Sequence, residues 1–278
     1  MSKIAVVTGA NQGLGLALAE GLAQQLQPED IVYLTSRDPD RVRAAAARIA
    51  GPRARVRGEV LDIRDAAGVT AFAQAIAARH GGVDVVFSNA AARLSPGTPA
   101  AELVATFVDT NNLGTTRLIR AFDPILRPGG RLLVVASAFG SLRELPAHLH
   151  RRFDTDAQSL DDLDATMLAW SDAVAHGRAA DEGWPEWINI PSKVGQVAAV
   201  RILARERSAA DAQDGTLVAA VCPGLIDTAA SRPWFDDMSD AQTPAQAAGA
   251  LLRLALDRDA DPGHYGELVQ FGKVIPWR

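Results

Sequence analysis

KIAVVTGANQGLGLALAEGLAQQL, residues 3–26, decides the fold of this chain. Its first part, Lys3–Val7, is a short apolar run rich in β-branched residues, which predicts a buried strand. Residues Leu14–Leu26 have the apolar spacing of a helix and follow a turn that contains glycine. A strand that passes through a glycine turn into a helix is the first part of a β-α-β unit, from which parallel sheets are built.

The rest of the chain repeats this alternation of strands and helices. Further strands are predicted at Ile31–Ser36, in a segment that ends near Asp62, and at Val83–Ala90, Gly130–Ser137, Thr216–Gly224 and Glu267–Gly272, with helices at Asp38–Ile49, Asp65–His80, Ala101–Phe122, Lys193–Ala210 and Pro244–Leu256. The pattern predicts an α/β fold, a Rossmann-type doubly wound parallel sheet of about seven strands. Ligands of such sheets bind at the carboxyl ends of the strands.

One segment, at about 142–187, interrupts the alternation. It is too polar for a sheet strand and too long for a plain connection in a compact domain. Apolar residues at helical spacing predict two helices, followed by a Gly-Trp-Pro turn. No repeat or low-complexity linker divides the chain, so we expect a single domain over residues 1–278 with this helical insertion.

Composition and charge exclude several classes of function. A chain of 278 residues that is 48% hydrophobic, with charges of both signs, is typical of a soluble globular protein. Its net charge of −5 gives no electrostatic reason to bind nucleic acid or an anionic membrane. Cys222 is the only cysteine, which excludes an internal disulfide and a cysteine-based metal site. The N-terminus lacks the features of a signal peptide, and we expect a cytoplasmic protein.

The glycines of TGANQGLG, Thr8–Gly15, predict a phosphate-binding turn. Glycine permits the tight turn and lets the backbone approach a pyrophosphate closely, and the helix N-terminus that follows offers free N–H groups. A glycine-rich turn without a ligand is the simpler alternative, but the strand before it and the helix after it favour dinucleotide binding. We assign to the cofactor the loop residues Gly9, Asn11, Gln12, Gly13, Leu14 and Gly15.

The end of the second strand indicates which dinucleotide binds. NAD sites usually place an acidic residue there for the ribose 2′-hydroxyl, whereas this chain has Ser36 and then Arg37. A guanidinium suits a 2′-phosphate because it makes charge-assisted and often bidentate hydrogen bonds. The alternatives are a solvated surface arginine and an influence of the adjacent Asp38. We therefore predict NADPH or NADP⁺ as the cofactor.

Several further motifs make the chain resemble the short-chain dehydrogenase/reductase superfamily over almost its whole length. TGANQGLG matches the pattern TGxxxGxG, SNAA (Ser88–Ala91) is similar to NNAG, and CPGLIDT contains the PG motif with its following threonine. The resemblance implies further contacts to the cofactor, made by Asp62, Ile63, Asn89, Ala90, Lys193, Pro223, Gly224 and Thr228.

The resemblance also implies a catalytic group with one departure from the pattern. Ser137 takes the place of the catalytic serine, Asn111 that of a helix asparagine, and Lys193 that of the lysine in Tyr-x-x-x-Lys. Asn189 stands where the tyrosine is expected. In the family that tyrosine gives a proton to the substrate oxygen, while the lysine lowers its pKa and binds the nicotinamide ribose. Asparagine donates hydrogen bonds but does not titrate.

Within the superfamily the chain resembles the carbonyl reductase subgroup, whose members are typically monomeric and NADPH-dependent. This likeness rests on the motifs LTSRD and EGWP (Glu182–Pro185) and on the long insertion. The insertion places Ser137 and Asn189 52 positions apart, much farther than in most of the family. The resemblance implies a monomer with a partly roofed pocket. Tryptophans either wall a flat substrate or form the core of the insertion: Trp170, Trp184, Trp187 and Trp234.

Three classes of function fit these residues. The first is a reductase that takes its proton from water or from His148, His150, Asp172 or Glu182, or whose substrate needs little proton donation. A protonated imine, an iminium or a conjugated carbonyl small molecule of specialised metabolism, apolar or aromatic, meets that condition. The second is a catalytically silent NADP(H)-binding sensor or scaffold, and the third is a non-redox enzyme on the same fold. We favour the reductase because the cofactor motifs are intact. The two tyrosines, Tyr33 and Tyr265, are expected to be structural.

Overall fold

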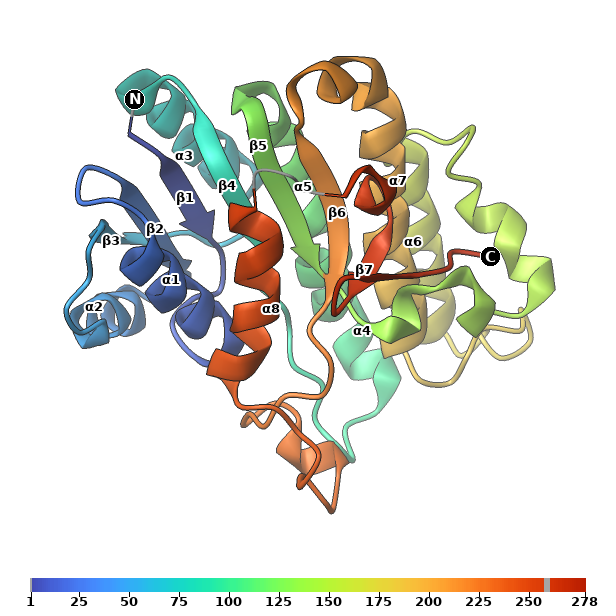
Figure 1. Ribbon diagram of the computed structural model, residues 1–278. Coiled ribbons are helices and arrows are strands. Elements are labelled where there is room, and N and C mark those ends of the chain that lie inside the picture. The colour runs from blue at the N-terminus through green and yellow to red at the C-terminus, as the bar shows by residue number, and fades with distance from the viewer. Residues whose placement is uncertain (1, 258–260) are drawn as a thin grey trace.

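The computed structural model describes residues 2–257 and 261–278, which form one eight-stranded sheet with helices on both faces (Figure 1). The strand order is β3-β2-β1-β4-β5-β6-β7-β8. The strands are β1 (Ile4–Val7), β2 (Ile31–Ser36), β3 (Arg55–Val60), β4 (Val83–Ser88), β5 (Leu126–Val135), β6 (Leu217–Cys222), β7 (Leu268–Gln270) and β8 (Lys273–Ile275). All neighbours are parallel except β7 and β8. The predicted doubly wound parallel sheet is confirmed.

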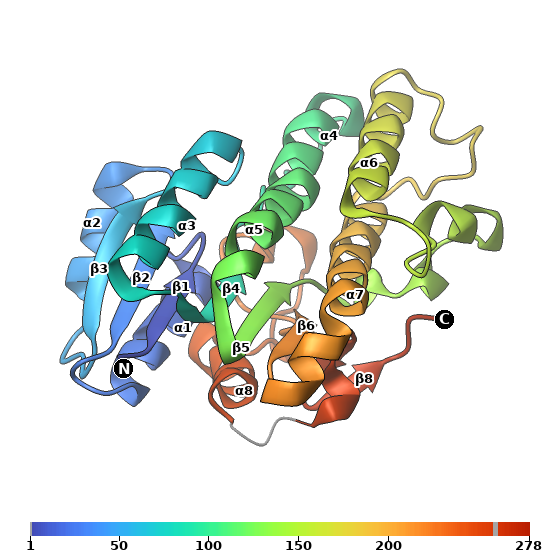
Figure 2. The ribbon, with the colours of Figure 1, turned by 90° about the horizontal axis from the view of Figure 1, so that it is seen from above.

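The helices complete two layers around the sheet. They are α1 (Gly13–Gln25), α2 (Pro39–Arg48), α3 (Ala66–His80), α4 (Ala100–Val108), α5 (Gly114–Phe122), α6 (Leu160–Ala175), α7 (Asn189–Asp214) and α8 (Pro244–Leu256). Viewed from above, α1 and α8 lie on one face and α3, α5 and α7 on the other (Figure 2). The central strands β1, β2 and β6 are buried at every position because both faces are covered, which explains their continuous apolar runs.

The sheet has one strand more than the sequence pattern predicted. Glu267–Gly272 was expected as a single last strand, but β7 turns back into the antiparallel β8. The two turn residues, Phe271 and Gly272, have φ values of 49° and 75°. Positive φ at both centres of a two-residue turn suits the right-handed twist of a hairpin. A residue with a Cβ rarely adopts a positive φ, so the sequence pattern did not indicate a turn at Phe271.

The long helix predicted at Ala101–Phe122 is interrupted. Between α4 and α5 the backbone forms a π-helical segment, η1 (Asp109–Leu113), which contains Asn111. Such segments insert one residue into a helix and often occur at functional sites. The helix predicted from Lys193 begins earlier, at Asn189. Pro191 is tolerated in this helix because it lies in the first turn, where a missing N–H costs no hydrogen bond.

The insertion holds one α-helix rather than the two predicted. Its first part forms two 3-10 segments, Leu142–Glu144 and Ala147–Phe153, separated by Pro146, which has no N–H to continue a helix. Only α6 is a full helix, and it begins at a capping box between Ser159 and Asp162.

Two of the four tryptophans considered above, Trp170 and Trp184, form the core of the insertion. Trp170 is fully buried, and its ring centroid lies 5.9 Å from that of Trp184. Phe153 packs edge-on against Trp184 at 6.2 Å. These rings hold the 3-10 segments against α6.

No helix in the described part of the chain is both long and apolar enough to span a membrane.

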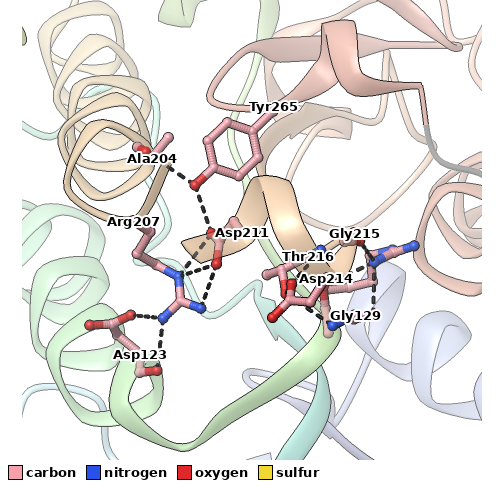
Figure 3. A network of polar contacts seen from close by, with 11 residues as sticks. Asp123, Gly129, Ala204, Arg207, Asp211, Asp214, Gly215, Thr216 and Tyr265 are labelled. Carbon is pink, nitrogen blue, oxygen red and sulfur yellow. Dashed lines mark hydrogen bonds and ion pairs between the residues drawn. The ribbon is translucent and has the colours of Figure 1, made fainter. Parts of the chain in front are cut away.

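A partly buried ionic network lies near the carboxyl end of α7 and the start of β6 (Figure 3). Arg207 binds both carboxylate oxygens of Asp211 and also contacts Asp123. The Tyr265 hydroxyl donates to Asp211 Oδ2 at 2.6 Å and to the Ala204 carbonyl at 3.1 Å. Burial and the Asp211 carboxylate raise the pKa of Tyr265. This tyrosine ties β7 to α7, the structural role expected of it.

Removing the carboxylate of Asp211 should destabilise the fold strongly. Its side chain is 0% exposed and accepts from both Arg207 and Tyr265, so Asp211→Ala removes the buried partner of both groups and leaves Arg207 with Asp123 alone. We expect a loss of about 3–5 kcal/mol in urea unfolding. Asp161→Ala is the control, because Asp161 is 91% exposed in its pair with Arg120, and such pairs contribute about 1 kcal/mol or less. Equal losses in both variants would contradict this assignment.

Candidate active-site cleft

A cleft of about 1090 Å³ opens at the carboxyl ends of β1, β2, β4, β5 and β6. It lies where the strand order changes direction, since β1 is flanked by β2 on one side and by β4 on the other. The loops that leave these two sides diverge and leave a crevice between them, as expected at the switch point of a doubly wound sheet.

Glycines of the β1–α1 loop bring this loop against the segment after β4. Gly9 has φ 63°, and a Cβ there would lie 2.6 Å from Ala90 Cα. A Cβ on Gly15 would lie 2.6 Å from the Gly9 carbonyl oxygen. No side chain caps the N-terminus of α1, and its first turn has no acidic residue. The loop therefore presents free N–H groups to the cleft, an arrangement suited to phosphate. The predicted residues Asn11, Gln12, Gly13 and Leu14 all line it.

Thr8 and Asn89 join the two sides of the crevice. The Thr8 hydroxyl accepts from the backbone N–H groups of Asn89 at 3.0 Å and Ala90 at 3.1 Å. The Asn89 side chain donates in return to the carbonyls of Thr8 at 2.9 Å and Gly9 at 3.3 Å. Asn89 therefore fixes the glycine loop, and its neighbour Ala90 lines the cleft beside it.

Arg37 is an exposed guanidinium on the cleft wall after β2. Among the described residues it forms no ion pair. Asp38 accepts from the N–H groups of Asp40 and Arg41, both at 3.0 Å, and so caps α2. The hydrogen bond from Arg41 lowers the pKa of Asp38. Because Asp38 is engaged by α2, Arg37 remains available to an anion.

Asp62 and Ile63 line the same end of the cleft, after β3. Arg64 binds both carboxylate oxygens of Asp62, at 3.1 Å from Nε and at 2.6 Å from Nη2. This side-chain hydrogen bond lowers the pKa of Asp62, so the carboxylate stays ionised.

Four predicted catalytic residues meet at the other end of the cleft: Asn111, Ser137, Asn189 and Lys193. Asn111 is buried, and its Oδ1 accepts from the Ala92 N–H at 2.8 Å. Ser137 follows β5, and its hydroxyl accepts from the Phe139 N–H at 3.4 Å. Asn189 and Lys193 are four residues apart on α7, which places both side chains on one helix face.

Comparison with known proteins identifies the family. A family model described as short chain dehydrogenase matches residues 3–147. The chain belongs to this family. It is 31% identical to carbonyl reductase [NADPH] 3 of Rattus norvegicus, over 99% of both chains. It is 28% identical to carbonyl reductase [NADPH] 1 of Mus musculus, over 99% of this chain and 98% of that protein. The structure of salutaridine reductase from Papaver somniferum has a similar fold, with a TM-score of 0.78 at 21% identity, covering 96% of this chain and 99% of that one.

Lys193 of this short chain dehydrogenase lies in an unusual environment. Its ammonium donates to Gln196 Oε1 at 2.7 Å, and burial lowers the pKa of Lys193 to about 8. Cys222, at the end of β6, is buried, and burial raises the pKa of its thiol. The Cys222 sulfur accepts from Gln270 Nε2 at 3.3 Å.

Two predicted residues of the PG motif and its surroundings line the cleft, and one does not. Gly224 and Thr228 are on the wall. Pro223 is absent from it, and its carbonyl accepts from Gln242 Nε2 at 3.0 Å. Pro223 therefore shapes the loop rather than the surface that a ligand would touch.

The four side chains considered as proton donors lie in the insertion and do not line the cleft. The His148 ring lies 3.0 Å from the Glu182 carbonyl, and that of His150 lies 2.9 Å from the Leu145 carbonyl. Glu182 pairs with Arg152 at 3.1 Å, and Asp172 pairs with Arg178 at 2.5 Å. Each is engaged in local contacts that hold the insertion together.

Neither tyrosine reaches the cleft. Tyr33 is 1% exposed, and its hydroxyl lies 2.8 Å from His80 Nε2. The ring of Phe72 packs edge-on against it at 5.8 Å. Tyr33 is therefore a core residue, as expected, and position 189 has no tyrosine substitute among the described residues.

Sequence reasoning missed part of an aromatic wall. The Phe139 and Trp187 ring centroids are 5.0 Å apart, and those of Trp187 and Trp234 are 6.3 Å apart. Phe235 lines the cleft beside them and is 45% exposed. Of the four tryptophans considered, Trp187 and Trp234 are thus cleft residues. The position of Phe139, only two residues after Ser137, was the one indication in the sequence that this ring would lie in the cleft. Gln196 was missed because a buried glutamine has no pattern of its own.

Proposed function

We propose that this short chain dehydrogenase is an NADPH-dependent reductase in which Asn189 orients the substrate instead of protonating it. The observation that carries this proposal is the shared cleft. The glycine loop and Arg37 lie at one end, and Ser137, Asn189 and Lys193 lie at the other. A protein that only binds the dinucleotide has no need of the second group, although fold alone does not fix function.

The residues of the cleft fit NADPH. The close approach of Gly9 to Ala90 leaves room for backbone only, and the uncapped α1 N-terminus suits a pyrophosphate. Arg37 suits the 2′-phosphate, and Asp62 and Ile63 lie where the adenine is held in the family. The names of the two carbonyl reductases specify NADPH. When bound, the nicotinamide supplies a hydride.

The side chains at the catalytic end then act on the hydride acceptor. The Ser137 hydroxyl and the Asn189 amide donate hydrogen bonds that orient and polarise the acceptor atom. Neither group titrates in the physiological range. A substrate whose reduction demands little proton donation suits this pair. A protonated imine, an iminium or an extended conjugated carbonyl is such a substrate.

The wall formed by Phe139, Trp187, Trp234 and Phe235 supports an apolar or aromatic small molecule of specialised metabolism as the substrate. Aromatic rings offer large apolar contact area and prefer stacked or edge-on partners. The two alternatives are a silent NADP(H)-binding sensor or scaffold and a non-redox enzyme on the same fold. Both predict a cleft that binds the cofactor or a small molecule without hydride transfer.

A monomeric protein of the carbonyl reductase type is also part of this proposal. The resemblance to the carbonyl reductase subgroup implies that the insertion covers helices that would otherwise pair in a tetramer. α6 packs against α4 and α7, and Arg120 on α5 pairs with Asp161 and Asp164 of α6. Light scattering should therefore give a mass near 29.4 kDa, that of one chain. A stable tetramer would show that the insertion leaves that surface free.

The cofactor preference has a direct test at Arg37. Wild-type protein should bind NADPH more tightly than NADH by on the order of 1.5–3 kcal/mol, as expected for one charged hydrogen-bonded contact. Arg37→Asp should reverse the preference in fluorescence titrations. Arg43→Asp is the matched control, because Arg43 is 78% exposed on α2 and does not line the cleft. Equal affinity of the wild type for the two cofactors would refute the assignment.

The role of position 189 is tested by two substitutions. Asn189→Ala should weaken turnover of an imine or enone only modestly, through a lost neutral hydrogen bond of about 0.5–1.5 kcal/mol. Asn189→Tyr restores the acid of the family beside Lys193 and should raise reduction of simple ketones, by part of the ~10²–10⁴-fold expected of a general acid. The measurement is NADPH absorbance with a panel of ketones, imines and enones. Wild-type protein that binds NADPH yet reduces none of them, with no gain in Asn189→Tyr, would favour the silent binder.

A further inference from the structure

The cleft presents few groups that can release a proton. Among the described residues that line it, those with titratable side chains other than arginine are Asp38, Asp62, Lys193 and Cys222. Asp38 caps α2 and Asp62 is bound by Arg64, and the pKa of each is lowered, so neither carries a proton near neutral pH. The Cys222 thiol is buried at the end of β6 and accepts a hydrogen bond from Gln270. Lys193 is the remaining candidate.

A buried amide positions Lys193. Gln196 is 2% exposed and lies one turn further along α7. Its Oε1 accepts from the Lys193 ammonium at 2.7 Å, and its Nε2 donates to Thr115 Oγ1 at 3.2 Å. The Thr115 hydroxyl donates in turn to the Asn111 carbonyl at 2.6 Å. The chain of contacts therefore runs from the ammonium to η1, the segment that holds the predicted catalytic asparagine.

The start of α7 is fixed against η1 by a second pair of hydrogen bonds. Ser192 Oγ donates to Asn112 Oδ1 at 2.9 Å, and Asn112 Nδ2 donates to the Ser192 carbonyl at 2.9 Å. Both side chains are buried. Lys193 thus projects from a rigid helix start, and its ammonium is held by a neutral acceptor rather than by a carboxylate.

We infer that Lys193 delivers the proton that the missing tyrosine would supply, and that Gln196 is the positioning residue that holds its ammonium at the substrate. This inference rests on the proposed reductase function and deepens it. Because Gln196 is neutral, it orients the ammonium without stabilising its charge as strongly as a carboxylate would. Thr115 fixes the amide so that its oxygen, and not its nitrogen, faces Lys193.

The electrostatic surroundings of Lys193 agree with this role. Burial lowers its pKa to about 8, close to the working range of a general acid. From β6, the Cys222 thiol is the titratable group that faces it, and negative charge there would raise the pKa of Lys193. Ser137 after β5 and Asn111 in η1 line the same cleft, and Gln196 on α7 accepts from the ammonium; none of these three side chains titrates. At pH 7 most Lys193 side chains are therefore protonated, and this fraction falls as the pH rises through about 8.

The step balances for an imine as the acceptor. With NADPH bound, the imine carbon would accept a hydride with its two electrons, the C=N π bond would break, and NADP⁺ would be left in the cleft. The ammonium of Lys193 gives one proton to the nitrogen and becomes a neutral amine. The product is a neutral amine, and Lys193 regains its proton from solvent.

The titration of Lys193 is directly observable because the chain has only three lysines: Lys3, Lys193 and Lys273. Reductive ¹³C-methylation gives each one a separate NMR signal, and Lys193→Arg assigns the one of interest. We expect that signal to titrate near pH 8, and the kcat for imine reduction to fall above the same pH. Gln196→Glu should raise both values by about 1–3 pH units, and Gln196→Leu should lower both. Lys273→Arg, exposed on β8, is the control and should move neither.

A second comparison separates proton delivery from cofactor binding. Arg at position 193 keeps the positive charge but does not release a proton. Lys193→Arg should therefore slow reduction of an imine by about 10²–10⁴-fold more than reduction of a permanently charged N-methyl iminium, which needs no proton. NADPH affinity is measured alongside for each variant.

The outcomes distinguish the two proposals. Equal losses on imine and iminium, or a pH limb that does not follow the NMR titration in the Gln196 variants, would overturn the role of Lys193 while leaving the reductase intact. Absence of hydride transfer from wild-type protein to either acceptor would overturn both.

Discussion

The hydrogen bonds between Thr8 and Asn89 hold together the two strand ends between which the sheet changes direction. They join the end of β1 to the segment after β4, with Thr8 accepting from two N–H groups and Asn89 donating to two carbonyls. The glycine loop on one side and Ala90 on the other then approach so closely that Gly9 has no room for a side chain. Every other part of the cleft is placed relative to this junction.

The catalytic end depends on a different constraint, the burial of a lysine without a carboxylate. α7 is locked to η1 through Ser192 and Asn112, and Lys193 lies half-buried on the wall of the cleft. The resemblance to the family implies a lysine that works through a tyrosine four residues earlier. With Asn189 in that place, the ammonium has a neutral partner, Gln196, and burial alone sets the direction of its pKa shift. The protein therefore keeps a titratable group at the site, although its expected acid is gone.

The sequence predicted the central sheet well because its signals are local. Continuous apolar runs mark strands that are covered on both faces, and a glycine turn marks the loop between β1 and α1. The insertion was less accessible. Its 3-10 segments are held by Trp170 and Trp184, which are far apart in the chain, and no local pattern encodes such contacts. The β7–β8 hairpin was missed because Phe271 adopts a positive φ that the turn usually reserves for glycine or asparagine.

In the candidate site, too, residues within local motifs were predictable and residues that depend on long-range contacts were not. Residues within motifs, such as Gly9, Ser137 and Lys193, were predicted and line the cleft. Gln196 lies outside any motif, and its importance arises only from a side chain across the helix interface, Thr115. The prediction that a side chain of the insertion donates the proton was wrong, because these side chains lie outside the cleft. His148 and Glu182 have suitable chemistry, but folding directs them to one another's neighbourhood and away from the cleft.

The proposed function depends on hydride transfer in a cleft that lacks the tyrosine. A single turnover with NADPH that carries deuterium at C4 of the reduced nicotinamide tests it most directly, with a cyclic imine as the acceptor and mass spectrometry of the product amine. Both C4 positions are labelled, so the outcome does not depend on which face reacts. If the cleft transfers hydride, the product amine carries one deuterium on the carbon that had been double-bonded to nitrogen. Unlabelled, unreduced imine recovered from protein saturated with the cofactor would contradict it.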